Sequence, residues 1–150
     1  MKIAIGNDHA GLALKKILIS VLADEGWDIC DCGTDEAVSC DYADYAHKVS
    51  KMVVAGDVDR GLLICGTGIG MSMAANKVHG IRAALVGDIF SAKATRAHND
   101  SNVLCLGERI VGAGLASEIL RVWLSEPFEG GRHQRRVDKI MKLETDHSCI

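Results

Sequence analysis

The 150-residue sequence has a single proline, few aromatic side chains, no strong excess of charge and no long apolar run. Aromatic residues make up 4% of the chain and the formal net charge is −3, which argues against the basic, stacking surface of a general nucleic-acid-binding protein. No apolar run approaches the roughly 18 residues of a membrane span, and no signal-peptide pattern opens the chain. We therefore expect a cytoplasmic protein that binds neither nucleic acid nor membrane.

The cysteines lack the spacing of familiar cysteine motifs. Positions 30, 32, 40, 65, 105 and 149 match neither C-x-x-C nor a zinc-binding pattern. Without a secretory signal, we expect all six to be reduced thiols. Cys149 lies in a polar tail and is predicted to be an exposed thiol without a role.

What the chain does contain is a regular alternation of apolar segments, with 48% hydrophobic residues to supply a core. Strands are predicted at residues 3–5, 27–32, 62–64, 81–86 and 103–106. Helices are predicted to begin near Leu12, Asp41, Ile69, Ile89, Val111 and Gln134, and to end near Gly26, Gly56, Val78, Ala97, Leu124 and Leu143. This alternation predicts one α/β domain, residues 1–144, with a parallel sheet, helices on both faces, and a tail at 145–150.

The most informative segment is Gly61–Gly70, in which a short apolar run ends at Cys65 and opens into alternating glycines. It is not a P-loop, which ends in Gly-Lys-Ser/Thr, nor a G-x-G-x-x-G dinucleotide motif. It is not a phosphatase loop either, because Met71 stands where an arginine would close a C-x5-R motif. Cysteine in a tight, buried turn is one interpretation. The other is a thiol beside amide donors at a strand end, which suits proton transfer next to a developing enolate.

Polar residues stand near the predicted ends of several strands. They are Asp8 and His9 after the first, Cys65 and Thr67 after the third, His98 and Asn99 before the fifth, and Arg109 after it. We expect these groups to converge on one edge of the sheet, where α/β proteins place their chemistry. The alternatives are that Asp8 caps the next helix and that His98 complements the dipole at a helix C-terminus.

The last predicted helix carries a basic patch that includes Arg132 and Arg136. The two arginines are four residues apart and so share one helical face, where they can bind a phosphate in a bidentate manner. A solvated charged face is the alternative interpretation. Because this helix follows Pro127 and a Gly-Gly pair, we expect it to reach a second subunit, placing the phosphate site and the thiol on different chains.

These residues resemble a known family, the type B ribose-5-phosphate isomerases, which include the galactose-6-phosphate isomerase subunits. The resemblance extends in order over almost the whole chain. The matching stretches are Asp8–Gly11, Gly33-Thr34, Asp41-Tyr42, Cys65–Gly70, Ala75–Lys77, Gly80–Ala83, His98–Asp100 and Glu129–Gln134.

The resemblance implies a Rossmann-like three-layer α/β/α sandwich with a five-stranded parallel sheet, and a homodimer or dimer of dimers with shared active sites. It implies no metal and no organic cofactor. Cys65 would be the catalytic base between C1 and C2, Thr67 would hold the enediolate oxygen, and His98 would open the furanose ring. The remaining substrate-binding residues would be Asp8, His9, Tyr42, Gly66, Gly68, Ile69, Gly70, Asn99, Arg109, Arg132 and Arg136.

The predicted function is therefore interconversion of D-ribose 5-phosphate and D-ribulose 5-phosphate through an enediolate, a step of the pentose phosphate pathway. The departures from the family pattern are Ala43, where proline is frequent, and Arg135, where glutamine is frequent. Neither removes a functional group, and Cys65 favours a catalytically complete chain. Two alternatives stay open: an isomerase of another phosphosugar (allose 6-phosphate, galactose 6-phosphate or a tetrulose phosphate), or a non-catalytic sugar-phosphate sensor.

Overall fold

The computed structural model describes residues 1–146, so the prediction for Cys149 lies outside the described residues. A five-stranded, all-parallel sheet forms the centre of the molecule, with strand order β2-β1-β3-β5-β4. The strands are β1 (Lys2–Asn7), β2 (Asp28–Asp31), β3 (Arg60–Cys65), β4 (Ala83–Leu85) and β5 (Val103–Gly107). The predicted parallel sheet is confirmed.

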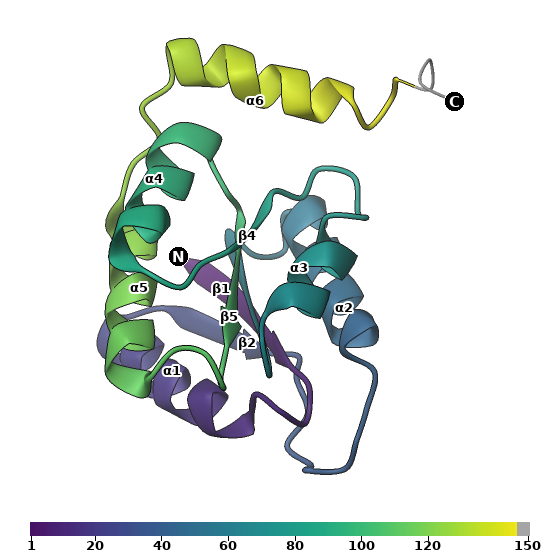
Figure 1. The fold of residues 1–150 in the computed structure, drawn as a ribbon, viewed down its shortest axis with the longest axis vertical. Helices are drawn as coiled ribbons and strands as arrows, with labels where there is room; N and C mark the ends of the chain where they lie inside the picture. The colour runs from purple at the N-terminus through teal and green to yellow at the C-terminus, as the bar shows by residue number, and fades with distance from the viewer. Residues whose placement is uncertain (147–150) are drawn as a thin grey trace.

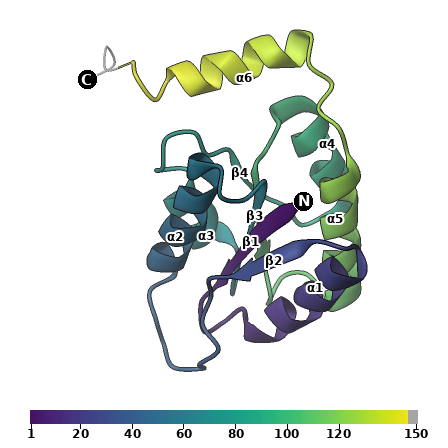
Figure 2. The same ribbon diagram turned by 180° about the vertical axis from the view of Figure 1, so that it is seen from behind.

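Helices cover both faces of this sheet (Figures 1 and 2). On one face lie α1 (Leu12–Asp24), α4 (Ile89–Asn99) and α5 (Ala113–Ser125); on the other lie α2 (Tyr42–Ala55) and α3 (Ile69–Ala75). The last helix, α6 (Arg132–Lys142), lies apart from both layers, beyond the end of the sheet at which the strands begin. The three-layer α/β/α sandwich is therefore confirmed.

The predicted boundaries lie within two residues of the observed ones except at the end of α3, which differs by three. β4 covers only part of the predicted 81–86 strand: Ala83–Leu85 pair with β5, whereas Ile81 and Val86 extend the apolar run but lie outside the paired segment. α3 ends at Ala75 rather than near Val78. The side chain of Asn76 ends it by exchanging two hydrogen bonds with the Ala83 backbone, 2.9 Å to the carbonyl oxygen and 2.8 Å from the amide.

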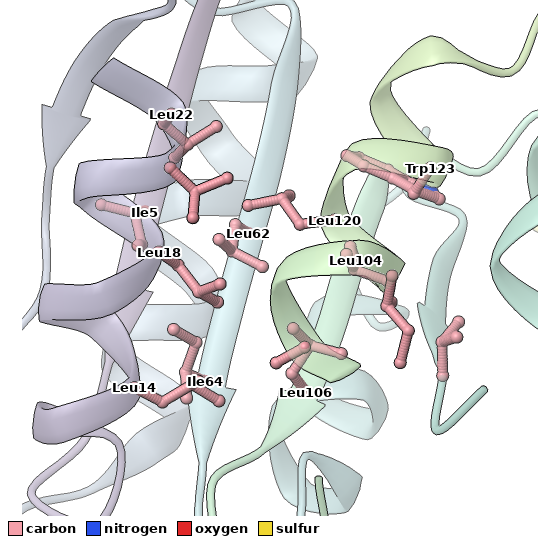
Figure 3. Packing of buried hydrophobic residues seen from close by; sticks show 14 of the residues in the cluster. Ile5, Leu14, Leu18, Leu22, Leu62, Ile64, Leu104, Leu106, Leu120 and Trp123 are labelled. Atoms are coloured by element: carbon pink, nitrogen blue, oxygen red, sulfur yellow. The ribbon is translucent and has the colours of Figure 1, made fainter. Parts of the chain in front are cut away.

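The central strands are apolar on both faces, and this explains why they read as continuous hydrophobic runs. Figure 3 shows Leu62 and Ile64 of β3 packed with residues of α1 and α5. Because side chains alternate along a strand, Leu63 and Cys65 point to the opposite face, toward α2 and α3. Cys65 thus lies on the last, inward-facing position of β3.

The strand register determines which loops meet. Cys65 pairs with Gly107 at one edge of the sheet, and Gly61 pairs with Val103 near the other. The loops after β1, β3 and β5 therefore share the carboxyl edge, whereas the end of α4 lies at the amino edge. The four steps from Val103 to Gly107 along β5 separate these two edges by about 13 Å.

Within residues 1–146, none of the helices combines the length and apolar character that crossing a bilayer requires.

Candidate active site

The Cys65 loop forms a tight turn around the thiol. The Gly68 N–H group donates a hydrogen bond to Cys65 Sγ at 3.1 Å, and the Cys65 side chain is only 5% exposed. Gly68 has φ 77°, and a Cβ atom there would lie 2.9 Å from the Leu106 carbonyl carbon, so the turn requires glycine. The glycine pattern therefore places an amide donor on the sulfur, where it can solvate negative charge.

Thr67 lies beside this thiol at the start of α3. Its Oγ1 accepts a hydrogen bond from the Ile69 N–H group at 3.3 Å, and the side chain remains exposed. The ring of Tyr42 covers the next glycine, Gly70, where a Cβ atom would lie 2.6 Å from the ring. The loop thus presents a hydroxyl group and a helix N-terminus, a combination that favours an oxyanion.

These residues line a cavity of about 430 Å³ at the carboxyl edge. Its walls are Asp8, His9, Ala10, Tyr42, Cys65, Gly66, Thr67, Ile69, Gly70, Met73 and Arg109. Backbone bonds fix the three loops to one another: the Asp8 N–H donates to Ile64 O at 3.2 Å, and the Arg109 N–H donates to Gly66 O at 3.0 Å. The structure therefore brings together the site residues predicted after β1, β3 and β5.

Asp8 does not cap α1. Its Oδ1 atom accepts a hydrogen bond from the Ala10 N–H group at 2.9 Å, which closes a local turn, and the N-cap position belongs to Gly11. Glu108, which follows β5, accepts instead from the Leu14 N–H group in the first turn of α1 at 2.8 Å. The capping interpretation of Asp8 was wrong, and the Asp8 carboxylate lines the cavity.

His9 is held by a residue that the sequence analysis did not single out. The Cys40 N–H group donates to His9 Nδ1 at 3.3 Å, and Cys40 Sγ lies 3.9 Å from the same nitrogen. A nitrogen that accepts a hydrogen bond carries no proton, so in the neutral ring the proton is on Nε2. The loop before α2 thus makes the other ring nitrogen of His9 a donor.

His98, Asn99, Arg132 and Arg136 do not join this cavity within the single chain. His98 and Asn99 form the last turn of α4, at the amino edge of the sheet, and the two arginines lie exposed on α6. The expectation that all polar groups converge on one edge was wrong for His98 and Asn99. A helix that connects parallel strands runs back along the sheet, so its C-terminus lies where the next strand begins.

At the amino edge, the end of α4 and the start of α6 meet at a pair of imidazole rings. His98 and His133 stack with their ring centroids 4.3 Å apart and their planes 5° from parallel. The Glu129 N–H group donates to Ala97 O at 3.0 Å, which attaches the segment before α6 to the end of α4. His98 therefore has a fixed neighbour, and its place in the last turn agrees with the helix-dipole interpretation.

Burial, the neighbouring His98 and the charge of Arg132 hold the pKa of His133 below its ordinary value of 6.5. Neutral His133 accepts a hydrogen bond on Nε2 from Arg132 Nε at 3.3 Å. Glu129 Oε2 lies 3.3 Å from the same nitrogen, and this contact becomes an ion pair only when the ring is protonated. The pair is therefore sensitive to pH.

The ligand atoms of His98, Glu129 and His133 lie within 4.8 Å of one another, a spacing that could suit a metal ion. Two observations oppose this interpretation. The lone pairs of two parallel, stacked rings lie in parallel planes and do not converge on one point. In addition, the Arg132 guanidinium already occupies His133 Nε2. The arrangement suits a stacked pair rather than a metal centre.

Comparison with known proteins identifies the family of this chain. Residues 3–140 match the sequence model of the Ribose/Galactose Isomerase family. A Bacillus subtilis protein described as "Putative sugar phosphate isomerase YwlF" is 56% identical over 96% of this chain and 97% of its own. The chain belongs to the ribose/galactose isomerase family.

Two further relatives agree with this assignment. Ribose-5-phosphate isomerase B of Escherichia coli is 48% identical, with 95% of this chain and 96% of that protein covered. The solved structure of ribose-5-phosphate isomerase B of Clostridium thermocellum is 49% identical, covers 97% of this chain and 98% of its own, and superposes with a TM-score of 0.95. As a member of the ribose/galactose isomerase family, the chain is an aldose–ketose isomerase.

Three residues of this isomerase that line the Cys65 cavity, hold one of its lining residues or lie at the amino edge were not predicted from the sequence. Met73 lines the cavity one helical turn after Ile69, a spacing that could have indicated it. Cys40 acts through its backbone, to which side-chain chemistry gives no clue. His133 follows Arg132 directly, but its stacking on His98 joins residues 35 positions apart, and no local pattern predicts such a contact.

Proposed function

We propose that this isomerase interconverts D-ribose 5-phosphate and D-ribulose 5-phosphate through an enediolate. The observation that carries the proposal is the buried Cys65 thiol with the Gly68 amide on its sulfur, in a cavity that also contains His9 and Arg109. A base, an oxyanion site and groups suited to a phosphate thus occur together. The ribose-5-phosphate isomerase B relatives support the choice of substrate.

In the proposed reaction, the Cys65 thiolate removes the C2 proton of the open-chain aldose and the resulting thiol returns it to C1, while the C2 hydroxyl proton passes to O1 and the carbonyl group moves to C2. Between these steps the C1 carbonyl oxygen carries negative charge. We assign the hydrogen bonds to this oxygen to the Thr67 hydroxyl and to the amides at the start of α3, all of which border the cavity. Asp8 and Tyr42, which also line the cavity, are proposed to orient the sugar hydroxyl groups. In this proposal Cys65 and Thr67 act at the reacting carbons, and the other lining residues position the sugar.

Ring opening needs a second proton carrier, and we assign this role to His98. A furanose must accept a proton on its ring oxygen and lose one from its C1 hydroxyl before C2 can be deprotonated. Because His98 and Asn99 lie at the amino edge of their own sheet, they would act in the active site of a second subunit. The stack on His133 supports this role by fixing the ring of His98.

The positions of Arg132 and Arg136 also favour an active site shared between two subunits. Both are exposed on α6, beyond the amino edge, and cannot reach their own Cys65 cavity across the length of the sheet. We propose a homodimer in which each α6 supplies these arginines to the partner's cavity, where they bind the substrate phosphate with His9 and Arg109. Remote phosphate binding of this kind provides energy for orienting the reacting carbons.

The carboxyl edge also presents apolar surface where such a partner would dock. Ile69, Leu85 and Ile110 line a second cavity of about 310 Å³ that adjoins Thr67, and Ile110 is 66% exposed. Phe90, in the first turn of α4, is 79% exposed. Exposed apolar groups around a catalytic cavity are typical of a subunit interface. They support the proposed dimer.

Galactose 6-phosphate is the second candidate substrate, because the family description covers both sugars. The chemistry at C1 and C2 is identical, and only the distance from the reacting carbons to the phosphate differs. Comparison of kcat/KM for ribose 5-phosphate, galactose 6-phosphate and allose 6-phosphate tests the assignment. We expect the highest value for ribose 5-phosphate, with deuterium from heavy water incorporated into the product. A higher value for a six-carbon sugar would contradict the assignment.

A further inference from the structure

We propose that Cys30, Cys32 and Met52 form a binding site for a soft monovalent metal ion, with Cu(I) as the favoured occupant. The three sulfur atoms lie together between β2 and α2, and none of them lines the Cys65 cavity. Two thiols and a thioether are the donors that select Cu(I) over harder cations. The cluster is separate from the isomerase chemistry.

The two distances from Cys32 to its sulfur neighbours agree with a shared ion. Cys30 Sγ lies 3.8 Å from Cys32 Sγ, and Cys32 Sγ lies 3.4 Å from Met52 Sδ. Three sulfurs at about 2.3 Å from a central ion, in a plane, would be about 4 Å from one another. The separations of Cys32 Sγ from its two neighbours are close to this spacing, so Cys32 is placed to share an ion with each of them.

The fold explains why these sulfurs meet. Cys30 belongs to β2, and Cys32 follows two positions later, so both side chains point to the same face of the sheet. Met52 approaches from α2, which packs on that face. Cys32 is 4% exposed, whereas Cys30 and Met52 are partly exposed. The site therefore has a buried donor and an opening through which an ion can enter.

The charges around the cluster are compatible with a monovalent ion. On binding, each thiol releases its proton to solvent and becomes a thiolate, so two thiolates and one Cu(I) carry a net charge of minus one. Lys48, one turn before Met52 on α2, is close enough to interact electrostatically with Cys32 and offsets this charge. The Asp31 carboxylate between the two cysteines is already paired with Lys15 Nζ at 3.0 Å.

The test is an anaerobic Cu(I) titration against the chromophoric chelator bicinchoninate. All proteins carry Cys65→Ala, so that the cavity thiol does not compete for the ion. We compare this background with Cys32→Ser, Cys30→Ser and Met52→Leu, and use Cys40→Ser as the control that removes a thiol outside the cluster. Thermal unfolding of each variant verifies that it is folded.

We expect the background protein and the Cys40→Ser control to withdraw one Cu(I) per chain from the chelator. Cys32→Ser and Cys30→Ser should each lose that equivalent. X-ray absorption should detect three sulfur ligands in the background protein and two in Met52→Leu. Undiminished Cu(I) uptake by Cys32→Ser and Cys30→Ser, or no uptake by the background protein, would overturn the proposal. An unchanged sulfur count in Met52→Leu would overturn the role of the thioether.

Discussion

The two ends of the sheet hold their functional residues in different ways. At the carboxyl edge, short backbone bonds fix the Cys65 loop to the segments that carry Asp8 and Arg109. At the amino edge, His98 is held by a stacked ring from α6 and by one backbone bond from Glu129 to Ala97. The carboxyl edge thus forms a cavity within one chain, whereas the amino edge carries half-buried and exposed groups that, under the proposed dimer, act in the cavity of a partner. The predictions below test whether the two ends of the sheet have these different roles.

The largest effect is expected at Cys65. Cys65→Ala should fold normally and lose on the order of 10²–10⁴-fold in kcat, the usual contribution of a general base. Steady-state kinetics with ribose 5-phosphate measures this loss, and Cys30→Ala, which removes a thiol outside the cavity, is the matched control. A Cys65→Ala enzyme with nearly full kcat would contradict the assignment of the base.

His98 should affect only substrates that must open a ring. His98→Asn is expected to lose on the order of 10²-fold or more in kcat with ribose 5-phosphate, because no group would then pass a proton to the ring oxygen. Erythrose 4-phosphate cannot form that ring, since its terminal oxygen carries the phosphate. Any wild-type activity on this tetrose should survive the substitution.

Equal losses on the two sugars would place His98 in the C1–C2 proton transfer itself, or in the structure. Comparing the two substrates with the same enzyme preparation corrects for any unfolded fraction.

Arg132 and Arg136 should affect binding rather than chemistry. Either Arg132→Ala or Arg136→Ala is expected to weaken phosphosugar binding by about 1.5–3 kcal/mol, as for a hydrogen bond to a charged group. The increase in KM, or in the dissociation constant of a phosphosugar inhibitor, measures this loss. Arg135→Ala, on the same helix, is the control. If Arg135→Ala weakens binding as much as Arg136→Ala, the loss reflects the general positive charge of the helix. It would then not reflect specific binding by the face that carries Arg132 and Arg136.

The smallest effect concerns stability at the amino edge. Because the pKa of folded His133 lies below 6.5, the unfolded chain takes up a proton first as the pH falls. The contribution of neutral His133 to the free energy of unfolding should therefore be complete above pH 6.5. It should decrease as the pH falls below 6.5. Urea unfolding at several pH values between about 7 and 5 measures the slope.

His133→Asn should flatten this dependence, whereas His47→Asn, an exposed histidine on α2, should leave it unchanged. An undiminished slope in His133→Asn would place the titrating group elsewhere.

Sequence patterns predicted the sheet, its layers and the carboxyl-edge cavity, because strand and helix periods and the glycine loop are local signals. Asp8 follows β1 directly, Cys65 is the last residue of β3 and Arg109 comes two residues after β5, so a parallel sheet must bring them together. His98 and Asn99 precede β5, and the same topology places them at the opposite edge. Contacts such as Cys40 with His9 and His133 with His98 depend on tertiary packing and have no local signature.

The central claim is that one active site combines the carboxyl edge of one subunit with the amino edge of another. Mixing Cys65→Ala with Arg136→Ala under conditions of subunit exchange tests it directly. In each mixed dimer, one site would carry both substitutions and the other would carry neither. When activity is assayed with substrate well below KM, where Arg136→Ala is itself impaired, random exchange of equal amounts should then restore about a quarter of wild-type activity. No recovery above the separate mutants, once mixed dimers are demonstrated by mass spectrometry, would contradict a shared site.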